Sequence, residues 1–302
     1  MRSWALAGVA LALMVGCDRT PAASEPGKPH RVLRTTVPVE DMIYVQGDAD
    51  QRLLAFLRKR YGDAALLGAP WKGDWEDTEV EALRPVTRSV CARDTVTSEG
   101  HEQTLLAVCQ TLDDAATVEP GRVDLYVLRL GKDDDEASHG SALAQPLAND
   151  PLEVIAQRLQ RQYGRHGAPG TVQIVQLGPQ RHAFHITHEE HRRGHRRIWR
   201  SYVALHNDRL RDVAQYRDHL DNLAQHGCDG NPADCGEGVF AVDFSTAVGD
   251  SNAVDGYWPL TVRASGRDCS GPATEYYHLI FDPRQRAYPV PDDLQRDGCA
   301  DR

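Results

Sequence analysis

The sequence lacks the short motifs that mark common catalytic sites. It contains neither GxSxG nor SxxK for a serine nucleophile, and neither GxGxxG nor GxxxxGK[ST] for binding phosphates. No CxxC pair is present, which argues against a clustered zinc site. We therefore predict no catalytic residue, no cofactor and no metal ligand, although enzymes without a short motif exist.

Long hydrophobic runs are also absent. The longest run, Trp4 to Val15, has 12 residues, whereas a membrane-spanning helix needs about 20. The run follows the positively charged Arg2, and together they fit the start of a secretory signal. Its end, Leu13-Met14-Val15-Gly16-Cys17, resembles the lipobox of bacterial lipoproteins. The resemblance covers only the first 20 or so residues, and no family is recognised for the folded part.

The lipobox implies a signal peptide over residues 1–16 and a lipid attached to Cys17. Asp18, directly after that cysteine, favours the periplasmic face of the inner membrane over the outer membrane. Residues 17–30 are rich in Pro, Ala and Ser and are predicted to be the anchor and a flexible linker.

The chain has seven cysteines, and six of them lie outside the lipobox. An even number in an exported chain indicates disulfide bonds. Two sit symmetrically about a turn at Gly100, and two bracket a short loop of turn-forming residues. The predicted pairs are Cys91–Cys109, Cys228–Cys235 and Cys269–Cys299.

Positive charge is scarce, since 34 Lys and Arg stand against 44 Asp and Glu, for a net charge of −10. This balance argues against a nucleic-acid partner, because such proteins gather positive charge. It permits attraction to a basic protein partner. The predicted partners are therefore a membrane, through the lipid, and another protein.

Two segments, Asp48–Gly62 and Asp150–Gly164, align without gaps. Each begins with an aspartate at the N-cap position, has a Gln or Glu three residues later, and ends at a glycine. We predict a helix over each. Strand-like sequence follows both: 82–92, 103–111 and 123–130, then 172–177, 182–187 and 197–206. Residues 210–220 fit either a helix or another strand.

The expected fold is α+β, with two helix-plus-antiparallel-strand repeats followed by a β-rich, disulfide-stapled unit. The first repeat covers residues 31–145 and the second covers 146–227. The C-terminal unit covers 228–302, with strands at 239–244, 260–264, 276–281 and 288–290. The acidic run at 133–136, inside the connector 131–146, is interpreted as a solvated loop.

Five histidines, at positions 182, 185, 188, 191 and 195, are the most suggestive cluster in the chain. They match neither HExxH nor HxxEH, and in a strand they would point to both faces. We interpret them as an exposed, polar hairpin tip, with metal binding as the alternative. The acidic turns at 229–234 and 250–256 depart from the calcium-loop pattern and are interpreted as turns.

Three functions remain open at this stage. The first is a periplasm-facing binding protein, similar in organisation to the immunity lipoproteins that protect bacteria from envelope-targeted effectors. The second is a structural or assembly lipoprotein of the envelope. The third, and the least favoured, is a metal-dependent hydrolase that uses the histidines.

Overall fold

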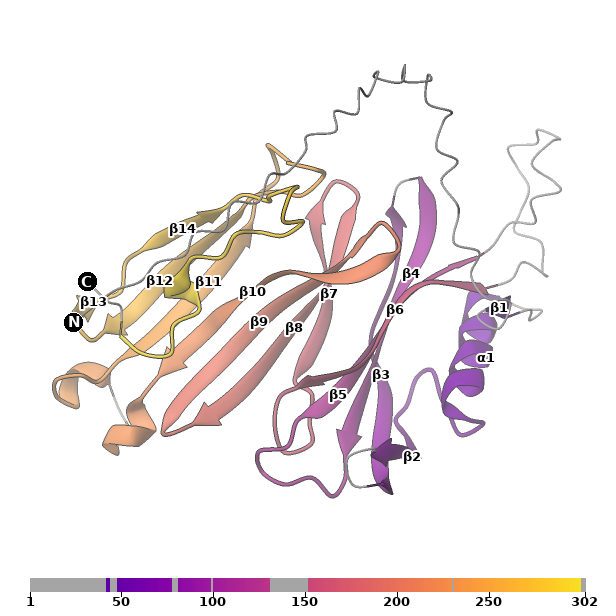
Figure 1. Ribbon diagram of the computed structural model, residues 1–302, viewed down its shortest axis with the longest axis horizontal. Helices are drawn as coiled ribbons and strands as arrows, with labels where there is room; N and C mark the ends of the chain where they lie inside the picture. Colours follow the sequence, from indigo (N-terminus) through magenta and orange to yellow (C-terminus); the bar gives the residue numbers. More distant parts are fainter. Residues whose placement is uncertain are drawn as a thin grey trace, which may run out of the picture. The chain divides into compact units, whose positions relative to one another are not determined.

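The computed structural model describes residues 42–43, 48–77, 81–98, 100–130, 152–229 and 231–299. These residues belong to one compact unit, Val37–Arg302. The predicted signal peptide, Cys17, the linker and the connector 131–146 lie outside them. Two antiparallel sheets form the unit (Figure 1). No helix in the described ranges is long and apolar enough to cross a membrane.

The first sheet has the strand order β1-β6-β5-β4-β3-β2. Its strands are β1 (Met42–Ile43), β2 (Trp71–Asp77), β3 (Ala82–Ser98), β4 (His101–Leu112), β5 (Gly121–Leu130) and β6 (Leu152–Tyr163). Beside it lies α1 (Ala49–Tyr61), the one α-helix of the described residues. The predicted capping box is confirmed, because the Asp48 carboxylate accepts from Gln51 N–H while the Gln51 side chain accepts from Asp48 N–H.

The second sheet has the order β13-β12-β11-β10-β9-β8-β7, with β14 also paired to β12. Its strands are β7 (Thr171–Gly178), β8 (Arg181–Arg192), β9 (His195–His206), β10 (Arg209–Asp221), β11 (Ala241–Val248), β12 (Leu260–Asp268), β13 (Gly271–Pro272) and β14 (Tyr276–Leu279). Two short 3-10 helices lie between β10 and β11, namely η3 (Leu223–His226) and η4 (Pro232–Asp234), and η5 (Asp292–Leu294) comes after β14. The ambiguous stretch 210–220 is therefore a strand.

The expected α+β fold is wrong, because the second predicted helix is strand β6. This strand pairs with β5 on one side and β1 on the other. Val154 packs against the core under α1, while Ile155 packs against the core between the sheets. A strand buried on both faces carries successive apolar residues. For this reason the sequence of β6 has apolar residues at the i, i+4 spacing of an amphipathic helix.

The sheet boundary also differs from the expected unit boundaries. Residues of the expected second repeat, 146–227, supply β6 to the first sheet and β7 to β10 to the second. Strand β10 then continues the same sheet into β11 of the expected C-terminal unit. The stretch 288–290 is not a strand, and the preceding turn is closed by a bridge between Asp282 and Ala287.

Three apolar cores hold these layers together. One lies between α1 and the first sheet, and a second joins the first sheet to β7–β10. The third includes residues of β7–β10 together with residues of β11, β12, β14 and the C-terminal segment. An ion pair of 2.6 Å between Arg158 of β6 and Asp212 of β10 also joins the two sheets.

The prediction of disulfide bonds is confirmed. The three bonded pairs are Cys91–Cys109, Cys228–Cys235 and Cys269–Cys299, with Cα–Cα separations of 5.7, 5.9 and 5.5 Å. The first pair joins β3 to β4 across the hairpin that turns at Gly100, which has a φ of +79°. The third ties the C-terminal residues to the end of β12.

Candidate functional site

The five histidines lie on the β8–β9 hairpin, as the strand interpretation required, and they divide between its two faces. His185 stacks on Tyr202 of β9, with ring centroids 5.0 Å apart. His188 points to the other face and meets the edge of Tyr163 from β6 at 5.2 Å. The alternation of side chains along a strand separates neighbouring histidines in this way.

The interpretation of these histidines as an exposed, polar hairpin tip is wrong for His185 and His188. His188 is only 8% exposed, and His185 is half-buried. Burial is the main cause that lowers the pKa of each imidazole to about 4. Arg200 adds to the pKa shift of His185, whereas at His188 Glu190 opposes the shift and Arg217 adds to it. Both side chains are therefore neutral at pH 7 and belong to the packed interior.

Two other histidines lie near the tip of the hairpin. His191 is exposed and pairs with the carboxylate of Glu189. His195 is half-buried, and its ring hydrogen-bonds to the carbonyl oxygen of Asp297 at 2.9 Å and to Gln225 at 2.9 Å. Across the described ranges, these histidines form no group of three metal ligands.

Strand β10, next to the hairpin, holds a buried charge that we did not predict from the sequence. Arg217 of β10 is 2% exposed, and its guanidinium lies 3.2 Å from the centroid of the Trp199 ring. Register places His188, Trp199 and Arg217 side by side on three neighbouring strands. Burial lowers the pKa of Arg217 to about 10, while Asp297 acts in the opposite direction. The guanidinium stays charged at neutral pH.

The charge on Arg217 is balanced by the C-terminal strap, defined here as residues 291–299. Asp297 of this strap forms ion pairs with Arg217 and with Arg197, which is 8% exposed. The Nε of Arg217 also donates to the carbonyl oxygen of Arg296 at 3.2 Å. These contacts hold the strap against β9 and β10.

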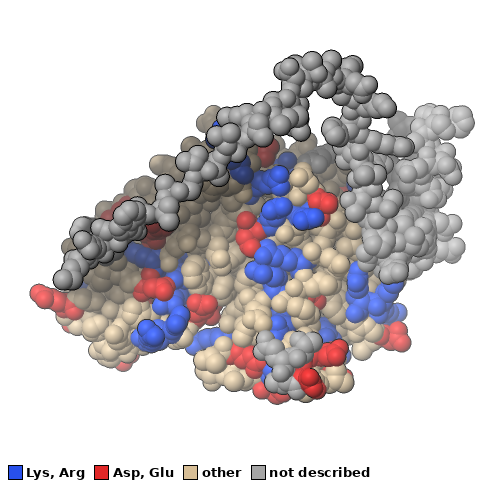
Figure 2. All heavy atoms as spheres, in the orientation of Figure 1, with Lys and Arg blue, Asp and Glu red and all other residues tan. Residues whose placement is uncertain are grey.

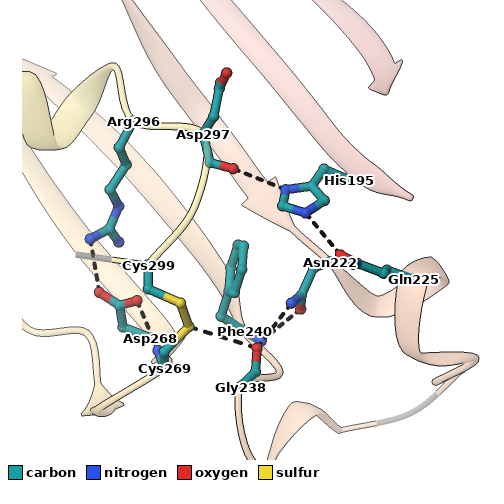
Figure 3. The surroundings of a disulfide bond; sticks show 10 residues. All are labelled: His195, Asn222, Gln225, Gly238, Phe240, Asp268, Cys269, Arg296, Asp297 and Cys299. Carbon is teal, nitrogen blue, oxygen red and sulfur yellow. Dashed lines mark hydrogen bonds and ion pairs between the residues drawn. A yellow bond between two sulfur atoms is a disulfide. The ribbon is translucent and has the colours of Figure 1, made fainter. Parts of the chain in front are cut away.

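Figure 3 shows how the strap is fixed at its far end. Cys299 is bonded to Cys269, and Arg296 forms an ion pair of 2.9 Å with the buried carboxylate of Asp268. The ligand atoms of Asp268, Cys269 and Cys299 lie within 4.8 Å of one another. Because the two sulfurs are joined in a disulfide, neither is a thiolate that could bind a metal.

The acidic turns behave as structural elements, in agreement with their interpretation. Asn231 caps η4 by accepting from the N–H of Ala233 at 3.1 Å. In the second turn, Asn252 and Asp255 take left-handed backbone conformations, and a bridge joins Val254 to Tyr257. The first turn uses a local side-chain hydrogen bond of an Asn, and the second uses the left-handed conformation that Asn and Asp tolerate.

A second buried polar cluster lies under α1. The carboxylate of Asp124, 2% exposed, accepts from Tyr61 at 2.7 Å, from Gln110 at 2.9 Å and from the backbone N–H of Gln160 at 2.6 Å. Burial raises its pKa, with these donors acting against the rise. The network is fully bonded and contributes to the attachment of α1 to the first sheet.

The outer face of β11, β12 and β14 remains open to solvent. Tyr276 and Ile280 are each 58% exposed, and Tyr276 lies under the guanidinium of Arg263 at 5.7 Å. Strand β14 pairs only with β12 among the described strands, so its other edge is open. We call this surface the outer face, and its exposed or half-exposed members are Ser245, Ala247, Thr261, Arg263, Tyr276, His278 and Ile280.

Among the described residues, the six cysteines are joined in disulfides and the Asp124 carboxylate is held by three hydrogen bonds. Figure 2 shows one face of the molecule, where Lys and Arg side chains lie among Asp and Glu side chains. Exposed aromatic and aliphatic side chains beside an open strand edge are features of binding surfaces. Comparison of this chain with protein-family models, with curated proteins and with solved structures finds no match.

Proposed function

We propose that this chain is a lipid-anchored protein of the cell envelope that faces the periplasm and binds another protein there. The most specific form of the proposal is an inhibitor or immunity protein that neutralises an envelope-targeted effector. The outer face of β11, β12 and β14 is the observation that carries the binding role. The three disulfides support an exported, oxidising location.

The chemistry of the outer face suits a protein partner. Tyr276 and Ile280 offer apolar area, and Arg263 is a hydrogen-bond donor beside them. Tyr and Arg are the residue types that carry most binding energy in protein interfaces. The open edge of β14 adds unpaired backbone groups that an extended segment of a partner can join. The net charge of −10 favours a basic partner, mainly by speeding association.

The anchor is tested by metabolic labelling with a fatty-acid analogue. The native chain should carry the label and fractionate with membranes. The Cys17→Ser variant should lose both properties. A native chain that never incorporates the label would contradict the lipid anchor while leaving the binding role open.

The binding role is tested by protection of living cells. Cells that express the chain should survive a related competitor that kills cells lacking it. The double variant Tyr276→Glu/Ile280→Glu should lose this protection, because it places charge in the centre of the outer face. Leu83→Glu, a matched change at a residue that is 69% exposed on the first sheet, should keep it.

A deletion strain separates the inhibitor function from a role in envelope assembly. An assembly protein should leave an envelope defect when it is deleted, even in the absence of a competitor. A deletion strain that shows this defect and no change in sensitivity to competitors would overturn the inhibitor proposal.

A further inference from the structure

A cluster of arginines surrounds His206 at one end of the second sheet. Strand β9 ends at His206, β8 begins at Arg181, and Arg211 is the third residue of β10. Ala183, Ala204 and Arg211 are cross-strand partners. Because side chains alternate, Arg181 and His206 point to the same face as this row.

Two segments from the C-terminal half close around this end. The N–H of Tyr288 donates to the carbonyl oxygen of Val213 at 2.7 Å, which brings the turn containing Arg286 beside β10. The N–H of Trp258 donates to Leu177 at 2.7 Å, and this seats the loop 250–257 beside β7. The guanidinium of Arg181 lies 5.5 Å from the Tyr257 ring in that loop.

The electrostatic potential at the His206 ring is positive. After burial, Arg286, Arg181 and Arg211 lower the pKa of His206, whereas Asp255 raises it. This end of the sheet thereby differs from the chain as a whole, whose net charge is −10. The nearby carboxylate of Asp282 accepts from the N–H of Arg284 at 2.8 Å and so stabilises its own turn.

Polar atoms in this cluster are also left without a partner. The Nε–H of Arg211 is a buried donor with no hydrogen-bond partner among the described residues, and the Nδ1 of His206 is a buried ring nitrogen without one. A buried donor without a partner costs free energy, which a ligand can recover. Burial and the arginines lower the pKa of His206, as expected in a region of positive potential.

We propose that His206, Arg211 and Arg286, with Arg181 at the side, bind the phosphoryl group of a phosphate monoester. Guanidinium groups match phosphate oxygens in shape and can bind them through two donors at once. A phosphate monoester carries about −1.5 to −2 charges near pH 7, and the positive potential at His206 attracts such a group. A lipid headgroup and a soluble phosphate ester present the same group. The site is separate from the outer face and independent of the proposed function.

The first test follows His206 by NMR in the full chain carrying Cys17→Ser, which has no acyl chain of its own. Inorganic phosphate should shift the His206 imidazole signal in a saturable manner and raise its pKa, because the bound anion offsets the arginines. Sodium chloride at the same ionic strength should not saturate it. Absence of a saturable shift with phosphate overturns the proposal.

Variants show whether the named residues form the site. Arg211→Ala/Arg286→Ala should weaken phosphate binding at least tenfold. The matched control Arg284→Ala, an exposed arginine on the same turn, should bind as the parent chain does. Asp255→Asn should tighten binding several-fold, a gain that loss of structure cannot produce. Equal affinity in all four proteins would place the binding elsewhere and overturn the proposal.

Vesicles then distinguish the two sources of the phosphoryl group. Binding to phosphatidic acid vesicles that is lost in Arg211→Ala/Arg286→Ala, with the same binding to phosphatidylcholine in both proteins, identifies a lipid headgroup. Binding of inorganic phosphate without this difference between vesicles identifies a soluble phosphate ester. Either result, together with the saturable shift of His206 by inorganic phosphate, supports the phosphoryl site. Vesicle binding without that shift overturns it.

Discussion

The guanidinium of Arg217 forms an ion pair with the carboxylate of Asp297, which joins β10 to the C-terminal strap across 80 residues of chain. The arginine is buried, whereas the side chain of the aspartate is 58% exposed. Arg197 contacts the same carboxylate at 3.3 Å. One carboxylate of the strap therefore pairs with two buried cations.

Asp297→Asn should destabilise the protein by about 1–3 kcal/mol. The change removes the ion-pair partner that Arg197 and Arg217 share, and breaking buried ion pairs is costly. Solvent near the exposed carboxylate reduces the effect below that of a fully buried pair. Urea unfolding of the variant measures the loss. Asp63→Asn, at an exposed position after α1, is the control and should be neutral.

Loss of each disulfide should destabilise the protein in the order of loop length. The sequence separations are 30 for Cys269–Cys299, 18 for Cys91–Cys109 and 7 for Cys228–Cys235. Chain entropy predicts losses of roughly 3.7, 3.2 and 2.4 kcal/mol. Thermal unfolding of three double-alanine variants tests this order. If the double variant at Cys228 and Cys235 is the least stable, loop entropy does not dominate.

Local features of this fold were predictable from the sequence. The capping box of α1 depends on residues three positions apart, and the Cys91–Cys109 pair depends on a symmetrical hairpin. Turn residues explain why Asn231 and Asn252 lie where they do. In each case, the information lies within about 20 residues of chain.

Long-range features were not predictable in this way. Whether 152–163 becomes a helix or a strand depends on β1 and β5 lying on either side of it, and no local pattern reports that. The burial of His188 depends on Tyr163 from the first sheet. Asp124 and Tyr61 are 63 residues apart, so their contact appears only after folding.

Tyr61→Phe should destabilise the protein by about 1–2 kcal/mol. The Asp124 carboxylate would lose a 2.7 Å donor, and Tyr126 would lose the hydroxyl partner that lies 2.8 Å away. A buried polar group that loses its partner costs more than the net value of one hydrogen bond. Chemical unfolding measures this change. Tyr276→Phe, on the exposed outer face, should be neutral, and equal losses in both variants would contradict the assignment.

Stability should fall as the pH is lowered from 6.5 towards 4, because His185 and His188 are buried in their neutral form. Their pKa in the folded chain is about 4, compared with an ordinary value of 6.5. Between these values the unfolded chain binds more protons than the folded one, so acid favours unfolding. The contribution is complete above pH 6.5 and is lost by pH 4. For the pair it amounts to roughly 2–5 kcal/mol, reduced for the partial exposure of His185.

The measurement is the free energy of unfolding at several pH values for the native chain and for His185→Gln/His188→Gln. Carboxylates also lose stabilising interactions in acid, so the decisive quantity is the difference in slope between the two proteins. The double variant should show a flatter decline between pH 6.5 and pH 4, even if it is less stable at pH 8. His101→Gln, at an exposed position on β4, should keep the native slope. Parallel profiles for the native chain and the double variant would mean that these two imidazoles are not buried as neutral groups.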